Sequence, residues 1–367
     1  MRRPKYSRTS DVEFVKTLKA RVAAYFDEKK ISRNANGAMV LKTVIMLLMY
    51  FGPLVLIISG IVAHPFLLFC LWVMMAFGMV GIGMSVMHDA NHGSYSKNPK
   101  VNAALGYLLN MAGGGSTKVW KIQHNVLHHS FTNIEGHDGD IDTGGLLRLS
   151  PNTKRLGIHR LQFFYAWFLY GLTTINWSTF KDYLQMAKYR KRGLTVKSKK
   201  QFTIQITRMT LAKIAYYVIF LVLPMTFSAA PWWMTLMFFF TMHFVAGIIS
   251  STVFQAAHVV PETAYPNLEE DGSVQHNWFV HQLKTTCNFS SNSRIFSWYV
   301  GGLNYQIEHH LFPNISHIHY RKISEIVRKT SREFHLPYHE HSNFATVMWA
   351  HAKHLWRLGR KDAVAVA

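Results

Sequence analysis

The sequence predicts an all-α integral membrane protein with four transmembrane helices in two hairpins and a helical cytoplasmic cap. Two long stretches, residues 43–87 and 214–261, contain no Asp, Glu, Lys or Arg, although the chain of 367 residues carries 40 basic and 19 acidic side chains. One crossing needs about 20 apolar residues, so each stretch fits two helices joined by a turn. Buried helices of a soluble protein would carry charged faces, and these stretches carry none.

Prolines mark the turn of each hairpin. Pro53 or His64-Pro65 interrupts the first apolar stretch, and Ala230-Pro231 interrupts the second. We therefore divide the chain into a basic amino-terminal segment 1–42, a first hairpin 43–87, a middle segment 88–210 with interfacial helices, a second hairpin 211–258 and a carboxyl-terminal segment 259–367. The glycines of GMVGIG, residues 78–83, lie inside a span, where small residues allow two helices to pack closely.

Basic residues indicate the orientation of the spans. Lys and Arg crowd into residues 1–42 and 181–200, whereas the turns inside the hairpins hold none. Cytoplasmic flanks collect such residues, so both termini and the middle segment are expected in the cytoplasm. The net charge of +21 suits anionic lipid headgroups, and we expect no nucleic-acid partner because the charges flank spans instead of interleaving with stacking aromatics.

Three histidine clusters lie on that cytoplasmic side. They are HDANH at 88–92, HNVLHH at 124–129 and the end of QIEHH at 306–310. Spacings of i and i+4 stack two imidazoles on one helical face, and an adjacent histidine points about 100° further round the helix. A single pair would be an ordinary surface or core feature, but three clusters predict metal ligands: His88, His92, His124, His128, His129, His309 and His310.

The number and type of these ligands favour two iron ions. One tetrahedral zinc uses four ligands, so seven nitrogens fit two ions of higher coordination better. Imidazole suits iron, copper, nickel and zinc alike. A many-histidine dinuclear centre beside an apolar pocket suits oxygen activation, and the H-E-x-x-H pattern of zinc hydrolases is absent. The two cysteines, Cys70 and Cys287, exclude a disulfide framework and a cysteine-ligated cluster.

Carboxylates near the clusters are expected to orient the imidazoles and to offset the charge of the ions. These outer ligands, or direct ligands in place of a missing histidine, are Asp89, Asp138, Asp140, Asp142, Glu308 and Gln306, with His137 as a hydrogen-bonding or ligating side chain. The acidic run at 138–142 lacks the spacing of a calcium-binding EF-hand loop.

The three clusters together resemble the membrane fatty acid desaturases, and in particular the front-end group, whose third motif begins with glutamine. The resemblance runs from about the first span to His319 and includes GGLNYQIEHHLFPNISHIHY. It implies a non-haem di-iron centre, O2 as co-substrate, and removal of two hydrogens from an acyl chain to give a cis double bond near the carboxyl end, of the delta-5 or delta-6 type. It implies no catalytic residues apart from the metal ligands.

The glutamine raises the question of what completes the ligand set, because Gln306 occupies a position where related enzymes have a ligand. Either its amide oxygen binds iron weakly or another residue takes that place. The resemblance includes an additional histidine at the end of the fourth span, and His258 is the candidate here.

Other residues near the third motif are candidates for a polar network or for the walls of a substrate tunnel. They are Trp120, Trp278, His281, Gln282, Thr285, Asn288, Trp298 and Asn304. Ordinary loop capping or core packing would explain them as well.

The resemblance also implies partners. The substrate is an acyl-CoA or an acyl-lipid. No haem-binding HPGG motif of a fused cytochrome b5 domain occurs in the sequence, so the electrons come from a separate ferredoxin or cytochrome b5. This feature favours a bacterial inner membrane, with the endoplasmic reticulum as the eukaryotic equivalent.

Two other functions remain open at this point. A membrane di-iron lipid hydroxylase would share the histidine motifs. A non-enzymatic metal-binding or transport protein would place its ionisable ligands inside the spans, where only His243 lies deep.

Overall fold

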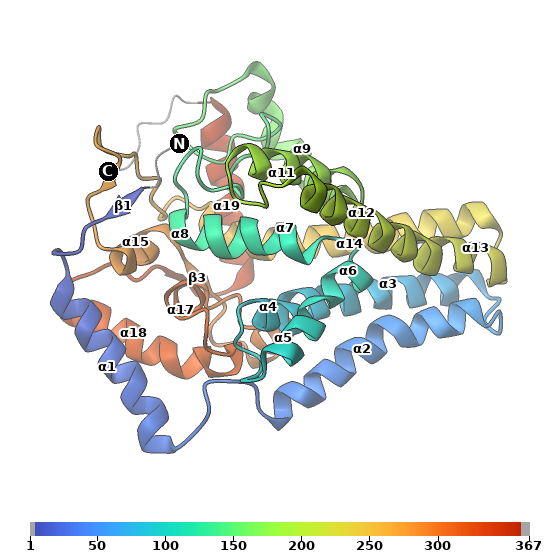
Figure 1. Ribbon diagram of the computed structural model, residues 1–367, viewed down its shortest axis with the longest axis horizontal. Coiled ribbons are helices and arrows are strands. Elements are labelled where there is room, and N and C mark those ends of the chain that lie inside the picture. Colours follow the sequence, from blue (N-terminus) through green and yellow to red (C-terminus); the bar gives the residue numbers. More distant parts are fainter. Residues whose placement is uncertain (1–3, 361–367) are drawn as a thin grey trace. The chain divides into compact units, whose positions relative to one another are not determined.

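The chain is mostly helical in the computed structural model, which describes residues 4–360 (Figure 1). Within those residues it divides into two compact units. Unit 1 contains the residues up to Ala35, Gln123–Trp167 and the residues from Thr252 onward. Unit 2 contains Asn36–Ile122 and Phe168–Ser251.

Four apolar helical segments of the described chain are long enough to cross a membrane. They are Gly37–Ile58, Pro65–Asn91, Lys199–Phe227 and Trp232–His258. These spans come in two consecutive pairs, each joined by a short turn, which confirms the predicted all-α architecture with four candidate transmembrane helices. Three belong to unit 2, and the fourth passes from unit 2 into unit 1 near Thr252.

The helices of unit 2 begin at recognisable caps. Asn36 accepts a hydrogen bond from the Met39 amide, and Ser198 accepts one from the Gln201 amide, so each satisfies a free N–H at a helix start. The elements are α2 (Gly37–Ile58), α3 (Pro65–Gly81), α4 (His88–Asn91), α5 (Pro99–Gly106), α6 (Leu108–Ala112), α7 (Thr117–Lys121), α10 (Thr173–Asn176), α11 (Asp182–Lys191), α12 (Lys199–Tyr217), α13 (Leu223–Phe227) and most of α14 (Trp232–His258). Single π-helical segments at Ile82–Met87, Trp177–Lys181 and Val218–Val222 continue three of them.

Glycine allows α2 and α3 to approach closely. A Cβ atom on Gly78 would lie 2.7 Å from the backbone nitrogen of Tyr50, and one on Gly81 would meet the side chain of Met46. The GMVGIG sequence therefore serves helix packing in this hairpin, as predicted.

Unit 1 joins segments that are distant in sequence. Its elements are β1 (Lys5–Tyr6), α1 (Val12–Lys29), α8 (His129–Phe131), a 3₁₀ helix (Gly157–Leu161), the start of α9 (Gln162–Gly171), β2 (Ser273–Val274), α15 (Trp278–Thr285), β3 (Asn288–Phe289), α16 (Arg294–Tyr299), α17 (Gln306–Leu311), a 3₁₀ turn (His317–His319), α18 (Tyr320–Glu333), β4 (Glu340–His341) and α19 (Phe344–Arg360). The strands form two parallel pairs, β1 with β2 and β3 with β4.

An apolar core under α1 and α18 fixes the position of α17. The buried side of α1, including Leu18 and Phe26, packs with Ile323 of α18. The same cluster includes Ile307 and Leu311 of α17, so the helix that carries the third histidine motif is anchored by its apolar side chains. Its polar side chains are thereby left to face the site.

Candidate metal centre

The second histidine motif lies on a π-helical segment, Ile122–His128, that continues into α8. A π-helix brings residues i and i+5 onto one face, and the Nε2 atoms of His124 and His129 lie 3.2 Å apart. The rings of His124 and His128 are also stacked, with centroids 5.4 Å apart. All three imidazoles therefore gather on one side of the segment, more tightly than α-helical spacing alone predicts.

The third motif and the end of α14 bring three more imidazoles to the same place in unit 1. The ring centroid of His258 lies 4.6 Å from that of His128 and 4.9 Å from that of His310. The rings of His129 and His309 have centroids 4.5 Å apart. All of these side chains are buried.

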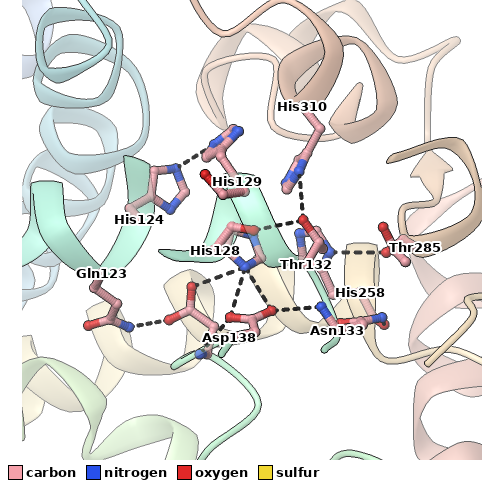
Figure 2. Close-up of polar contacts among 12 residues, drawn as sticks. Gln123, His124, His128, His129, Thr132, Asn133, Asp138, His258, Thr285 and His310 are labelled. Atoms are coloured by element: carbon pink, nitrogen blue, oxygen red, sulfur yellow. Dashed lines mark hydrogen bonds and ion pairs between the residues drawn. The ribbon is translucent and has the colours of Figure 1, made fainter. Parts of the chain in front are cut away.

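Nitrogen and oxygen atoms in three groups of these side chains are close enough to share an ion. The potential ligand atoms within each group lie within 4.8 Å of one another, and the groups are His128, His258 and His310; His129, His309 and His310; and His124, His128 and Asp140. Figure 2 shows several of these rings converging from α8, α14 and α17.

Acceptor atoms fix the tautomer of three histidines. His128 Nδ1 lies 3.1 Å from Asp138 Oδ2, His258 Nδ1 lies 3.3 Å from the Thr285 carbonyl oxygen, and His310 Nδ1 lies 2.8 Å from Gln282 Oε1. Each of these oxygens can only accept, so each Nδ1 carries the proton. The lone pair of each neutral ring is then on Nε2, which is the atom that binds a metal when Nδ1 is held by an outer acceptor.

Among these three histidines, His128 gives the strongest indication of a metal ligand. Its Nε2 atom is buried and makes no hydrogen bond among residues 4–360. A buried polar atom without a partner is costly unless a ligand satisfies it. The chemistry of His128, His258 and His310 therefore fits a metal ion bound through Nε2 atoms.

Asp138 is the centre of the hydrogen bonds on the opposite side of His128. Its carboxylate is buried and also accepts from the backbone amides of Asn133 and Asp140, each at 2.9 Å. Asp140 Oδ2 lies 3.4 Å from His128 Nδ1, and its carboxylate accepts from Gln123. Burial lowers the pKa of His128, but the two carboxylates outweigh it and the pKa is raised.

Three other candidates for outer ligands in unit 1, Asp142, His137 and Glu308, have surroundings different from those of Asp138. Asp142 is exposed and accepts from the Gly144 amide, so it caps a turn. His137 is buried, and its ring packs against Phe131. Glu308 is fully buried and turned toward Asn288 and Tyr338.

Glu308 connects the third motif to the strand pair. Its carboxylate accepts from Asn288 Nδ2 at 2.8 Å and from the Tyr338 hydroxyl at 3.1 Å. Burial raises its pKa to about 7, although both hydrogen bonds act in the opposite direction. Asn288 also accepts from the Ile307 amide, so it holds the first turn of α17.

Gln306 lies beside His258. Its amide Nε2 donates to His258 Nε2 over 2.9 Å. The glutamine of the third motif thus lies against His258, the additional candidate ligand from the sequence. The Gln306 amide therefore lies next to the group formed by His128, His258 and His310.

Most of the predicted polar network is also assembled in unit 1. His281 donates through Nε2 to the Thr132 carbonyl oxygen, and burial lowers its pKa to about 4. Trp278 donates to the His129 carbonyl oxygen at 3.0 Å. Asn304 donates to the Phe289 carbonyl oxygen, whereas Trp298 is 42% exposed, which places its ring at the surface.

Three residues near the rings were not identified from the sequence. Thr132 lies 3.3 Å from His310 Nδ1, the Tyr320 hydroxyl lies 3.3 Å from His309 Nδ1, and Tyr338 contacts Glu308. Thr132 lies three residues after His129, and Tyr320 is the last residue of GGLNYQIEHHLFPNISHIHY, so two of the three lie close to a motif in the sequence.

The first motif is described within unit 2. The rings of His88 and His92 have centroids 4.8 Å apart, and Trp120 packs edge-on against both, at 5.6 and 5.8 Å. Asp89 is buried next to His88. The i, i+4 spacing therefore places both imidazoles on one side of α4, as the sequence predicts.

Comparisons with known proteins agree with the resemblance. The fatty acid desaturase family profile matches residues 63–342. An sn-1 linoleoyl-lipid 6-desaturase of Synechocystis sp. is 33% identical over 95% of this chain and 96% of its own length. The corresponding enzyme of Arthrospira platensis is 35% identical over 91% of this chain and 89% of its own. An acyl-lipid (8-3)-desaturase of Physcomitrium patens is 33% identical over 96% of this chain and 73% of its own.

Proposed function

Because the chain belongs to the fatty acid desaturase family, an oxidoreductase family, we propose that it introduces a cis double bond at the 6 position of a fatty acyl chain held in a membrane lipid. Support for this position and for a lipid carrier comes from the names of the two bacterial relatives, which match nearly the whole chain. The (8-3)-desaturase of the moss favours a 5-type product as the second candidate.

The observation that carries the proposal is the set of six buried imidazoles in unit 1. His124, His128, His129, His258, His309 and His310 would hold two iron ions, with His128, His258 and His310 binding through Nε2. Bound iron supplies the activation of O2 that is needed to remove hydrogen from an unactivated methylene group. His88 and His92 remain predicted ligands from the first motif.

The protein's own residues prepare the rings for this role. Asp138, the Thr285 carbonyl and Gln282 keep the Nδ1 protons in place, so the three rings need no change of tautomer when metal binds. At His258 the Gln306 amide must also move away from Nε2. The burial of the rings keeps bulk water away, which strengthens electrostatic interactions and protects reactive oxygen from side reactions.

The reaction needs electrons from outside the substrate. Reduction of one O2 to two waters takes four electrons and four protons, and the acyl chain supplies two of each. The other two electrons come from a separate ferredoxin or cytochrome b5, for which the basic flanks of the spans would form the docking face. In this proposal the site and both termini lie in the cytoplasm, and the chain is in a bacterial inner membrane.

The test is expression in a host that lacks front-end desaturases and is fed linoleate. Lipids are extracted and double bonds are located by mass spectrometry for the wild type, His128→Ala and His64→Ala. We expect a new double bond at carbon 6 in the wild type. His128→Ala should lose it, because the tautomer-fixed ligand is gone.

His64→Ala is the matched control. This histidine is exposed at the start of α3 and belongs to none of the ligand groups found in the described chain, so product formation should continue. A double bond at carbon 5 would support the second candidate, and hydroxylated lipids would indicate the hydroxylase. Equal product from His128→Ala and wild type would refute the assignment of the metal centre.

A further inference from the structure

In unit 2, α11 and the preceding π-helical segment lie beside α12 (Figure 1). Side chains of these elements line a groove. Its volume is about 300 Å³, and its lining includes no residue of the three histidine clusters. The lining residues are Ser178, Thr179, Tyr183, Thr210, Lys213, Ile214, Tyr217, Val218 and Val222.

One wall of the groove is apolar and exposed. Ile214, Val218 and Val222 follow each other at intervals of four residues, so they form a stripe along one face of the helix. They are 54%, 41% and 49% exposed, in a candidate span of which only 22% is buried. An exposed stripe on a membrane helix contacts acyl chains.

The polar end of the groove contains the ammonium group of Lys213, whose three hydrogens are all used in hydrogen bonds. Lys213 Nζ donates to the carbonyl oxygens of Gly114 and Trp177, at 2.7 and 2.6 Å, and to Asp182 Oδ2 at 2.8 Å. Three donors meet three acceptors, and Asp182 neutralises the charge. Lys213 therefore offers neither a free charge nor a free hydrogen to an anionic ligand.

The hydroxyl groups that line the groove also donate their hydrogens to acceptors within the protein. Ser178 donates to the Ile175 carbonyl oxygen, so Tyr217 must donate its proton to Ser178 Oγ, at 2.9 Å. Thr210 donates to the Ile206 carbonyl oxygen, so Tyr183 must donate to Thr210 Oγ1, at 3.0 Å.

Thr179 completes the pattern, because its hydroxyl donates to the Ile175 carbonyl oxygen at 2.7 Å. Each of these oxygens retains lone pairs. The polar end of the groove therefore accepts hydrogen bonds and has no donor to offer, and it is bordered by two tyrosines of the kind found at membrane interfaces.

We propose that this groove binds one membrane phospholipid whose headgroup donates hydrogen bonds. One acyl chain lies along Ile214, Val218 and Val222, and the headgroup ammonium donates to the tyrosine and threonine oxygens. A headgroup with primary ammonium hydrogens satisfies such a site, whereas a fully methylated ammonium of the same charge does not. The proposal concerns a bound lipid distinct from the acyl chain that is desaturated, and it is independent of the proposed reaction.

The test compares phosphatidylethanolamine with phosphatidylcholine carrying the same two acyl chains. The full chain is purified in detergent, exchanged into mixed micelles with equal amounts of both lipids, and analysed by native mass spectrometry. We expect one retained lipid per chain, with phosphatidylethanolamine favoured about fivefold, which corresponds to one hydrogen bond of about 1 kcal/mol. Equal retention of both lipids by the wild type would overturn the proposal without any variant.

Variants locate the lipid. Val218→Trp fills the groove and should abolish retention, whereas Leu211→Trp, on the same helix and 59% exposed but outside the lining, should not. Replacing Tyr183 and Tyr217 together by Phe removes two acceptors but keeps the rings, so the lipid should remain and the preference for phosphatidylethanolamine should fall. Unchanged retention by folded Val218→Trp, or an unchanged preference in the tyrosine variant, would contradict the assignment. Migration as a dimer with no retained lipid would indicate that a second copy covers the groove.

Discussion

Replacing Asp138 by Asn tests how the protein prepares His128 for metal. Either side-chain oxygen can become the amide nitrogen in the variant. At Oδ2 it would face the Asn133 amide, and at Oδ1 the Asp140 amide, both now 2.9 Å from an acceptor. Both orientations place a donor against a backbone donor. Leaving that buried amide unsatisfied costs about 1–3 kcal/mol in the free energy of unfolding.

The second consequence concerns the metal. The carboxylate accepts from His128 Nδ1 and thereby keeps the lone pair on Nε2. Without it, the ring can take the other tautomer, in which Nε2 carries the proton and cannot bind. Loss of such an outer partner typically lowers metal affinity 10- to 100-fold, which corresponds to about 1.4–2.8 kcal/mol in binding free energy.

Iron bound per chain after dialysis against graded concentrations of a chelator measures this affinity. Thermal unfolding of fully chelated protein measures the stability effect separately. Asp142→Asn is the matched control, because Asp142 is exposed and the retained Oδ1 of Asn can still accept from the Gly144 amide. The reasoning is refuted if folded Asp138→Asn protein holds iron as tightly as the wild type.

Two further predictions concern the contact between His258 and Gln306 and the close packing of α2 against α3. His258→Ala should lose iron from one of the two positions, whereas Gln306→Ala should keep the metal and change activity. Metal analysis of the purified variants tests this difference. Full iron occupancy in His258→Ala would contradict the prediction. Gly78→Ala should lower stability by about 1–3 kcal/mol, because its Cβ would lie 2.7 Å from the Tyr50 nitrogen, whereas Gly83→Ala meets no atom within 4 Å and should be tolerated. Loss of monomer on heating in detergent compares the glycine variants, and equal midpoints would count against close packing.

The spans and the clusters could be predicted from the sequence because each depends on local patterns. A long stretch without charged residues is typical of a lipid environment, and the two such stretches predicted four transmembrane helices. The limits of the helices were harder to predict. Helix α2 begins at Gly37 and includes Lys42, which is only 2% exposed, because a cap at Asn36 and burial by other segments override the charge pattern.

The fine arrangement of the rings could not be predicted. Spacing implies α-helical geometry, but a π-helical segment brings His124 and His129 together, and no residue type encodes that insertion. The partners of the Nδ1 atoms come from far along the chain, as with Gln282 for His310 and Tyr320 for His309. Such contacts depend on the packing of α15 and α18 against α17, which local sequence patterns do not contain.

The geometry around Gln306 explains why a glutamine can occupy a position where a histidine ligand is expected. His258 Nδ1 is bonded to the Thr285 carbonyl oxygen, so its single remaining lone pair, on Nε2, receives the Gln306 amide. That lone pair cannot serve an amide donor and a metal ion at once. With metal on His258, the amide must turn, and a turn by half a revolution replaces the donor nitrogen by the acceptor oxygen at the same place. The predictions for His258→Ala and Gln306→Ala therefore concern two side chains that share one hydrogen bond.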